Sequence, residues 1–163
     1  MITAFNLAGF FAAHAIWCVS DGEGLAPTFA YTDENNEKKM ERLVLNGDLA
    51  VSVKVGQGKL ESNEADANDA VLVYDGRIPI QEHKYDAIII EIRSYFSPGA
   101  KAMMAVPYSP AASGKFRVFK PKLLQWEECE DFEVNIAVQS FFEGVDAHEQ
   151  GAAVWNTALD QSI

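Results

Sequence analysis

The sequence is poor in cysteine, in basic residues and in long apolar runs, and each shortage excludes a class of protein. Two cysteines among 163 residues are too few for a disulfide framework, and their spacing matches no zinc motif. No uninterrupted apolar run reaches about 18 residues, so the sequence predicts no membrane-spanning segment. With 13 basic against 24 acidic residues, the net charge of −11 argues against nucleic-acid binding, which needs a basic surface.

The sequence motifs of the large enzyme classes are also missing. The chain contains no glycine-rich phosphate loop, no G-x-S-x-G nucleophile turn, no H-E-x-x-H helix and no C-x-x-C pair. The stretch DAHEQG at 146–151 lacks the second histidine that a zinc protease places one turn further on. The sequence therefore predicts no cofactor, and it favours a non-catalytic protein over an enzyme.

The length and the beginning of the chain bear on domain organisation and localisation. We expect one domain over 1–163, since a chain of this size can bury roughly 70% of its surface without staples. The stretch FNLAGFFAAHA resembles the core of a signal peptide, but no basic residue precedes it and His14 interrupts it. We therefore expect a cytoplasmic protein of bacterial type with free thiols.

Periodicity predicts an α+β fold. Apolar residues recur at helical spacing over 3–19, and again from Val138 to Leu159. Runs rich in β-branched and aromatic residues predict strands within 26–33, 38–45, 70–76, 85–96, 101–108 and 115–126. Short polar or glycine-containing connections favour an antiparallel meander in the C-terminal half. We expect an antiparallel sheet of about six strands, covered on one face by the N- and C-terminal helices.

The segment 48–60 admits two interpretations. The dipeptide Asn46-Gly47 between two apolar runs is typical of a hairpin, and Leu49, Val51, Val53 and Val55 alternate as they would in a strand. Asp48 could equally cap a helix that runs toward Leu60, although two glycines would weaken that helix.

The basic residues are unevenly distributed along the chain. Six of them, and no acidic residue, lie between Ile92 and Trp126. Alternation along the strand at 85–96 places Glu91, Arg93 and Tyr95 on one face, where Lys101 or Arg117 could pair with them across strands. Glu91, Arg93, Tyr95, Lys101 and Arg117 are therefore the candidate ligand-binding residues, for a small anion or an acidic partner. The alternative is that these charges merely face water.

His14 and His148 each occupy an apolar position of their predicted helices. Cys18 lies one turn beyond His14 on the same face. Three interpretations stay open: a Cys18–His14 nucleophile pair, a zinc site formed with His148, or two structural histidines at the edge of the core. No spacing motif supports the first two, so we assign neither a catalytic residue nor a metal site.

Taken together, these patterns favour a non-catalytic binding or regulatory module that recognises a protein partner or a small anionic ligand. One alternative is a small enzyme or metal-binding protein that uses His14, Cys18 and His148. A second alternative is a homodimer without any ligand. Binding of nucleic acid or insertion into a membrane is not expected.

Overall fold

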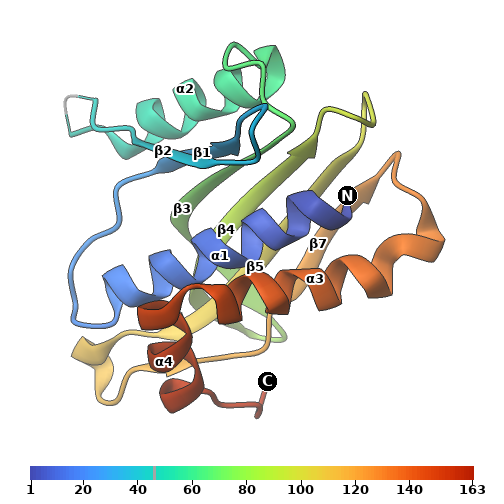
Figure 1. Ribbon diagram of the computed structural model, residues 1–163. Helices are drawn as coiled ribbons and strands as arrows, with labels where there is room; N and C mark the ends of the chain where they lie inside the picture. The colour runs from blue at the N-terminus through green and yellow to red at the C-terminus, as the bar shows by residue number, and fades with distance from the viewer. Residues whose placement is uncertain (46) are drawn as a thin grey trace.

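A curved antiparallel sheet forms the centre of the computed structural model, which describes residues 1–45 and 47–163. Helices α1 and α3 lie on one face of the sheet, and helix α2 lies on the other (Figure 1). The α+β class expected from the sequence is confirmed, including the cover formed by the N- and C-terminal helices. The helices are α1 (Ile2–Val19), α2 (Leu49–Ser62), α3 (Val134–Ala147) and α4 (Glu149–Ala158), with short 3₁₀ turns at Ala111–Ser113 and Asp131–Glu133.

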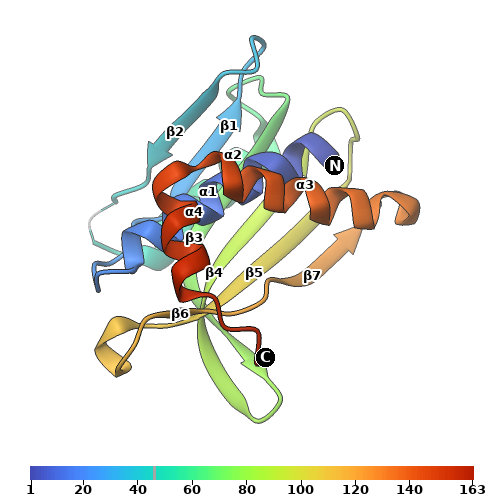
Figure 2. The same ribbon diagram turned by 60° about the horizontal axis from the view of Figure 1, so that its bottom comes forward.

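The sheet has seven strands in the order β2-β1-β3-β4-β5-β6, and β7 also pairs with β5. The strands are β1 (Thr28–Thr32), β2 (Lys38–Arg42), β3 (Asp69–Ile80), β4 (His83–Ser94), β5 (Lys101–Ser109), β6 (Arg117–Val118) and β7 (Lys122–Glu127). Strands β3, β4 and β5 form the meander, whereas β6 and β7 pair with opposite ends of β5 (Figure 2). The strand expected within 70–76 is longer in the structure: β3 continues through Asp75-Gly76 to Ile80, and Gly76 pairs in register with Ala87.

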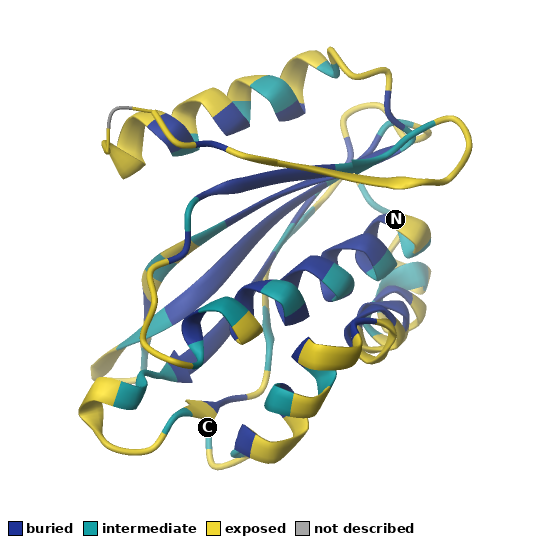
Figure 3. Ribbon diagram, turned by 60° about the vertical axis from the view of Figure 1, so that its left-hand side comes forward, coloured by how far each residue is buried: buried dark blue, intermediate teal, exposed yellow. Residues whose placement is uncertain are grey.

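Helix α1 is the centre of the main core. One side of it covers the isoleucine face of β4, formed by Ile88, Ile90 and Ile92, all of which are fully buried. Its other side contacts α3, so that most of α1 is buried (Figure 3). By length and composition α1 could cross a membrane, yet 61% of it is buried inside this fold. Apolar burial on this scale is the dominant favourable contribution to folding.

Glycines allow α1 to approach the C-terminal helices very closely. A Cβ atom on Gly9 of α1 would overlap the carbonyl oxygen of Phe141 in α3, and a Cβ atom on Gly144 would overlap that of Asn6. Gly151 in α4 stands in the same relation to the carbonyl oxygen of Ala13. These glycines weaken their helices slightly, but they bring the backbones into contact.

The ambiguous segment 48–60 is helical, and the strand interpretation is wrong for Leu49–Ser62. Asp48 is the N-cap: its carboxylate accepts hydrogen bonds from the backbone N–H groups of Ala50 and Val51. Capping of this kind satisfies N–H groups that have no partner inside a helix. Asn46, half of the expected hairpin turn, lies outside the described residues. Helix α2 buries only a narrow face, and most of its residues are exposed (Figure 3).

The C-terminal segment is helical, as expected, but it is divided at His148. This residue has an extended backbone and caps α4, since its Nδ1 accepts a hydrogen bond from the backbone N–H of Gly151 at 2.9 Å. The helical spacing from Val138 to Leu159 continues across this division, so the spacing alone does not reveal it. Here a histidine side chain takes the capping role that Asp, Asn or Ser usually has.

Candidate functional site

Two basic residues meet across the strands β4 and β5. Arg93 and Lys101 are directly opposed partners in the antiparallel register. Because side chains alternate along a strand, both point to the face of the sheet that α2 covers. The expected cross-strand pairing of Arg93 with Lys101 is therefore present.

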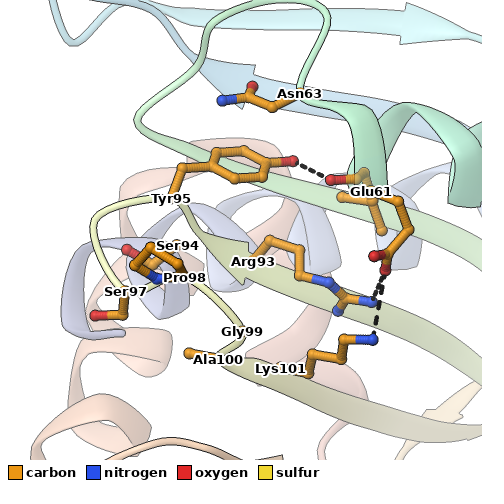
Figure 4. A pocket seen from close by; sticks show the side chains of 11 residues that line it. Glu61, Asn63, Arg93, Ser94, Tyr95, Ser97, Pro98, Gly99, Ala100 and Lys101 are labelled. Atoms are coloured by element: carbon orange, nitrogen blue, oxygen red, sulfur yellow. Dashed lines mark hydrogen bonds and ion pairs between the residues drawn. The ribbon is translucent and has the colours of Figure 1, made fainter.

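These two residues line a cavity of about 370 Å³, the basic pocket, shown in Figure 4. Its wall on the other side is the last turn of α2, with Leu60, Glu61 and the following Asn63. The loop that joins β4 to β5, residues 95–100, closes one end. A volume of this size is within the usual range for small-molecule sites.

A single carboxylate holds both cations. Glu61 Oε1 lies 2.9 Å from Arg93 Nη2 and 3.7 Å from Lys101 Nζ. The hydrogen bond from Arg93 lowers the pKa of Glu61 below its ordinary value, although burial acts in the opposite direction. The Glu61 side chain is 58% exposed, whereas that of Arg93 is only 12% exposed. The pocket thus carries two positive charges against one exposed negative charge.

The Arg93 guanidinium is only partly satisfied. Its Nη1 donates to the carbonyl oxygen of Ile92 at 3.0 Å, and its Nη2 donates to Glu61. Its Nε is buried and has no hydrogen-bond partner among the residues that the structure describes. Buried donors are normally paired, so the guanidinium has one unused hydrogen-bonding group, which lies beneath the pocket surface.

Tyr95 has a structural part in the pocket. Its hydroxyl donates to the carbonyl oxygen of Leu60 at 2.6 Å, which ties the C-terminal end of α2 to the sheet. Burial raises the pKa of Tyr95 to about 12, so the hydroxyl stays protonated as this donor. Tyr95 therefore positions the helix that carries Glu61.

The two other candidate ligand-binding residues lie elsewhere. Glu91 is 6% exposed beneath α2 and accepts hydrogen bonds from Gln57 Nε2 and from the Tyr74 hydroxyl, both at 2.9 Å. Arg117 lies on β6, at the far end of β5 from Lys101, and forms an ion pair with Asp160 at 3.3 Å. Nine residues of extended strand separate those ends by about 25 Å. The basic residues of 92–126 therefore do not form one patch.

Glu61 was missed in the sequence because the stretch 61–69 looks like a polar, acidic connection. Its place opposite Arg93 depends on α2 being a helix that folds back on the sheet. Asp48 was the one available signal, since a capped helix of this length brings Glu61 to the end of β4.

The two histidines from distant parts of the chain do meet. His14 Nδ1 lies 3.2 Å from His148 Nε2, and Cys18 Sγ lies 3.7 Å from the other ring nitrogen of His14. His148 is 8% exposed. The centres of the Phe10 and Trp17 rings lie 4.9 and 5.9 Å from the centre of its imidazole ring. The pair is therefore embedded among aromatic side chains.

The hydrogen bonds fix the order of donors in this chain of groups. Because Gly151 N–H donates to His148 Nδ1, the neutral His148 carries its proton on Nε2 and donates to His14 Nδ1. His14 then carries its own proton on Nε2, which points toward the Cys18 sulfur. Cys18 thus faces a donor rather than a base, and this arrangement does not activate a nucleophile.

The pKa shifts agree with this arrangement. Burial, followed by the nearby His148, lowers the pKa of His14, and burial lowers the pKa of His148. Burial raises the pKa of the Cys18 thiol. A nucleophilic cysteine needs the opposite shift. Burial also raises the pKa of the second cysteine, Cys129.

The same geometry disfavours a shared zinc ion. His148 and Cys18 contact opposite nitrogens of the His14 ring, so the three side chains do not converge on one point. Within residues 1–45 and 47–163, no group of three or more His, Cys, Asp and Glu side chains is placed to hold a metal ion.

Comparisons with known proteins add no functional information. No protein-family model, no curated protein and no solved structure matches this chain. The functional argument therefore depends on the basic pocket itself.

Proposed function

We propose that this protein is a non-catalytic binding module for a small anionic ligand, a carboxylate or a phosphate, held in the basic pocket. The observation that carries the proposal is the shared ion pair: Arg93 and Lys101 point at one exposed carboxylate, that of Glu61. In an otherwise acidic chain, this pocket offers a local excess of positive charge.

The ligand would take the place that Glu61 holds. Its oxygens would accept from Arg93 Nη2 and Lys101 Nζ, the two donors that Glu61 now occupies. Charge-assisted hydrogen bonds from a guanidinium and an ammonium suit a carboxylate or a phosphate. The Glu61 side chain is already exposed, so it can turn away from the pocket into solvent without a desolvation cost.

The test is the removal of this internal competitor. Exposed ion pairs contribute up to about 1 kcal/mol, so Glu61→Gln should tighten anion binding by up to about fivefold. Arg93→Gln should abolish most of the binding. NMR titrations with inorganic phosphate and with succinate, read at the amides of the β4–β5 loop, measure both effects and distinguish the two anion classes.

Arg117→Gln is the matched control because it removes the same charge far from the basic pocket. We expect it to bind phosphate and succinate as the unaltered protein does. The proposal fails if Glu61→Gln weakens binding, or if Arg93→Gln and Arg117→Gln have equal effects. Equal effects would mean that the anions respond to overall charge and not to this pocket.

The alternatives predict different results. An enzyme or a metal protein based on His14, Cys18 and His148 would show a perturbation of those side chains on adding substrate or zinc. A homodimer would show twice the mass of the chain in size-exclusion chromatography with light scattering. The cytoplasmic location and a protein partner likewise stay predictions.

A further inference from the structure

The junction between α3 and α4 carries a buried histidine that forms two hydrogen bonds. His148 is the single residue between the two helices. Its Nδ1 accepts from the backbone N–H of Gly151 at 2.9 Å, and its Nε2 donates to Nδ1 of His14 on α1 at 3.2 Å. The first hydrogen bond caps the start of α4, and the second fastens that end of α4 to α1.

This pair of histidines has no ring nitrogen left for an additional proton. A neutral imidazole takes up its second proton at the nitrogen that acts as an acceptor. In His148 that nitrogen already faces the N–H of Gly151, and in His14 it already faces the N–H of His148. A proton on either acceptor would place two donors against each other, and moving the His148 proton to Nδ1 would only transfer the conflict to Gly151. Protonation of the pair therefore breaks one of the two hydrogen bonds.

The charged groups around His14 do not compensate for an added proton. After burial and the neighbouring imidazole, the positive charge of Arg42 on β2 is the third cause that lowers the pKa of His14. Cys18 contacts the other ring nitrogen of His14, but burial raises the pKa of its thiol, so the sulfur is neutral. The carboxylates of Asp21 and Glu23 affect the pKa of this thiol and not that of His14. An imidazolium at position 14 would therefore face a cation and a neutral thiol.

His148 likewise lacks a carboxylate partner. Asp146 and Glu149, its nearest acidic neighbours in the sequence, are exposed. In the part of the chain that the structure describes, no carboxylate forms an ion pair with either histidine. The charged group nearest on the adjoining strand β2 is Lys38, whose Nζ lies 4.8 Å from the centre of the Phe10 ring beside His148. A proton on the pair would thus gain no ion pair in exchange for the hydrogen bond that it breaks.

The other end of α4 is fastened separately. Leu159 forms a bridge with Val118 of β6, and the backbone N–H of Asp160 donates to the carbonyl oxygen of Val118 at 2.8 Å. Asp160 also forms the ion pair with Arg117. None of these contacts involves the histidines. Loss of a hydrogen bond at His148 therefore loosens the first turn of α4 while its last turn stays attached to the sheet.

We propose that His14 and His148 form a proton-sensitive latch, which releases the first turn of α4 from α1 in mild acid. At neutral pH both rings are neutral and the latch is closed, because burial keeps their pKa values below the ordinary 6.5. Release makes the rings of Phe10 and Trp17, which lie beside His148, accessible to solvent. The latch is independent of the basic pocket, since it uses none of the same residues.

Hydrogen exchange followed by NMR tests the latch on the folded protein. The protection of an amide is its exchange rate relative to an unstructured chain at the same pH, measured at Gly151 in α4 and at Ile90 in β4 between about pH 7.5 and about pH 5. We expect the protection of Gly151 to fall by up to about tenfold per pH unit for each proton taken up, and to stay below that of Ile90 throughout. The double variant His14→Gln/His148→Asn, which keeps a capping side chain, should lose this pH dependence.

His83→Gln is the matched control, because it removes the third histidine of the chain from an exposed position at the start of β4. It should keep the pH dependence of the unaltered protein. The proposal is overturned if Gly151 is as well protected as Ile90 at about pH 5, because α4 would then separate only when the whole protein unfolds. It is also overturned if the double variant keeps the pH dependence or if His83→Gln abolishes it. Should the double variant not fold, His148→Asn alone gives a second reading: it caps α4 without a titratable group, and it should reduce the pH dependence.

Discussion

Replacing Gly144 with alanine should destabilise the protein, although alanine is the better helix former. A Cβ atom at this position would lie 2.9 Å from Phe10 N and nearer still to the carbonyl oxygen of Asn6. Real Cβ atoms essentially never lie within 3.0 Å of another heavy atom, and both obstacles are backbone atoms that cannot rotate away. Helices α1 and α3 would have to separate.

The magnitude follows from two opposing contributions. Alanine should gain about 1 kcal/mol of helix propensity, whereas overpacking costs about 1–3 kcal/mol and more where backbone must move. Because the obstacle is backbone, we expect a net loss of about 1–2 kcal/mol. For a chain of this size, that lowers Tm by about 2–8 °C.

Gly58→Ala is the matched control. Gly58 also lies inside a helix, α2, but a Cβ atom there would meet nothing within 4 Å. The propensity gain then acts alone, and Tm should rise by about 2–4 °C. Thermal unfolding followed by circular dichroism measures both variants. If the two substitutions shift Tm in the same direction, the close contact between α1 and α3 is refuted.

Two further predictions concern the histidines and Cys18. Burial holds the pKa of His14 and of His148 below the ordinary 6.5 of the unfolded chain. As the pH falls below 6.5, the unfolded chain therefore binds more protons than the folded protein, and the folded protein loses stability. Each histidine should change the free energy of unfolding by less than about 1.4 kcal/mol per pH unit. The double variant His14→Gln/His148→Asn, which keeps a capping side chain at position 148, should flatten the pH dependence of the free energy measured by urea unfolding. An unchanged slope would contradict this prediction. Cys18 should react with iodoacetamide more slowly than free cysteine at neutral pH, because burial raises its thiol pKa, and faster reaction would revive the nucleophile hypothesis.

The sequence was most informative where one periodicity prevailed. The isoleucines of β4 alternate without interruption, and the strand and its buried face follow directly. The segment 48–60 satisfies both a strand and a helix pattern. Its apolar residues do not mark a buried face that would distinguish the two, because Leu49, Val51 and Val55 are exposed on α2. Only the cap at Asp48 and the contact of α2 with the sheet distinguish the two.

The sites depend on contacts between residues far apart in the chain. Alternation correctly brought Arg93 and Lys101 together, since both lie on neighbouring strands of a meander. Glu61 could not be found in this way, because no local pattern says which strand a helix will cover.

The central position of α1 also shapes how the chain must fold. Asn6 and Ser140, which join α1 to α3, lie 134 residues apart. At about 5–20 residues per second, a ribosome adds that much chain in roughly 7–27 s. During that time 18 mostly apolar residues emerge without the strands and helices that later bury them. The helix that stabilises the finished protein is thus an aggregation-prone segment of the nascent one, and folding is expected to be slow for the same reason.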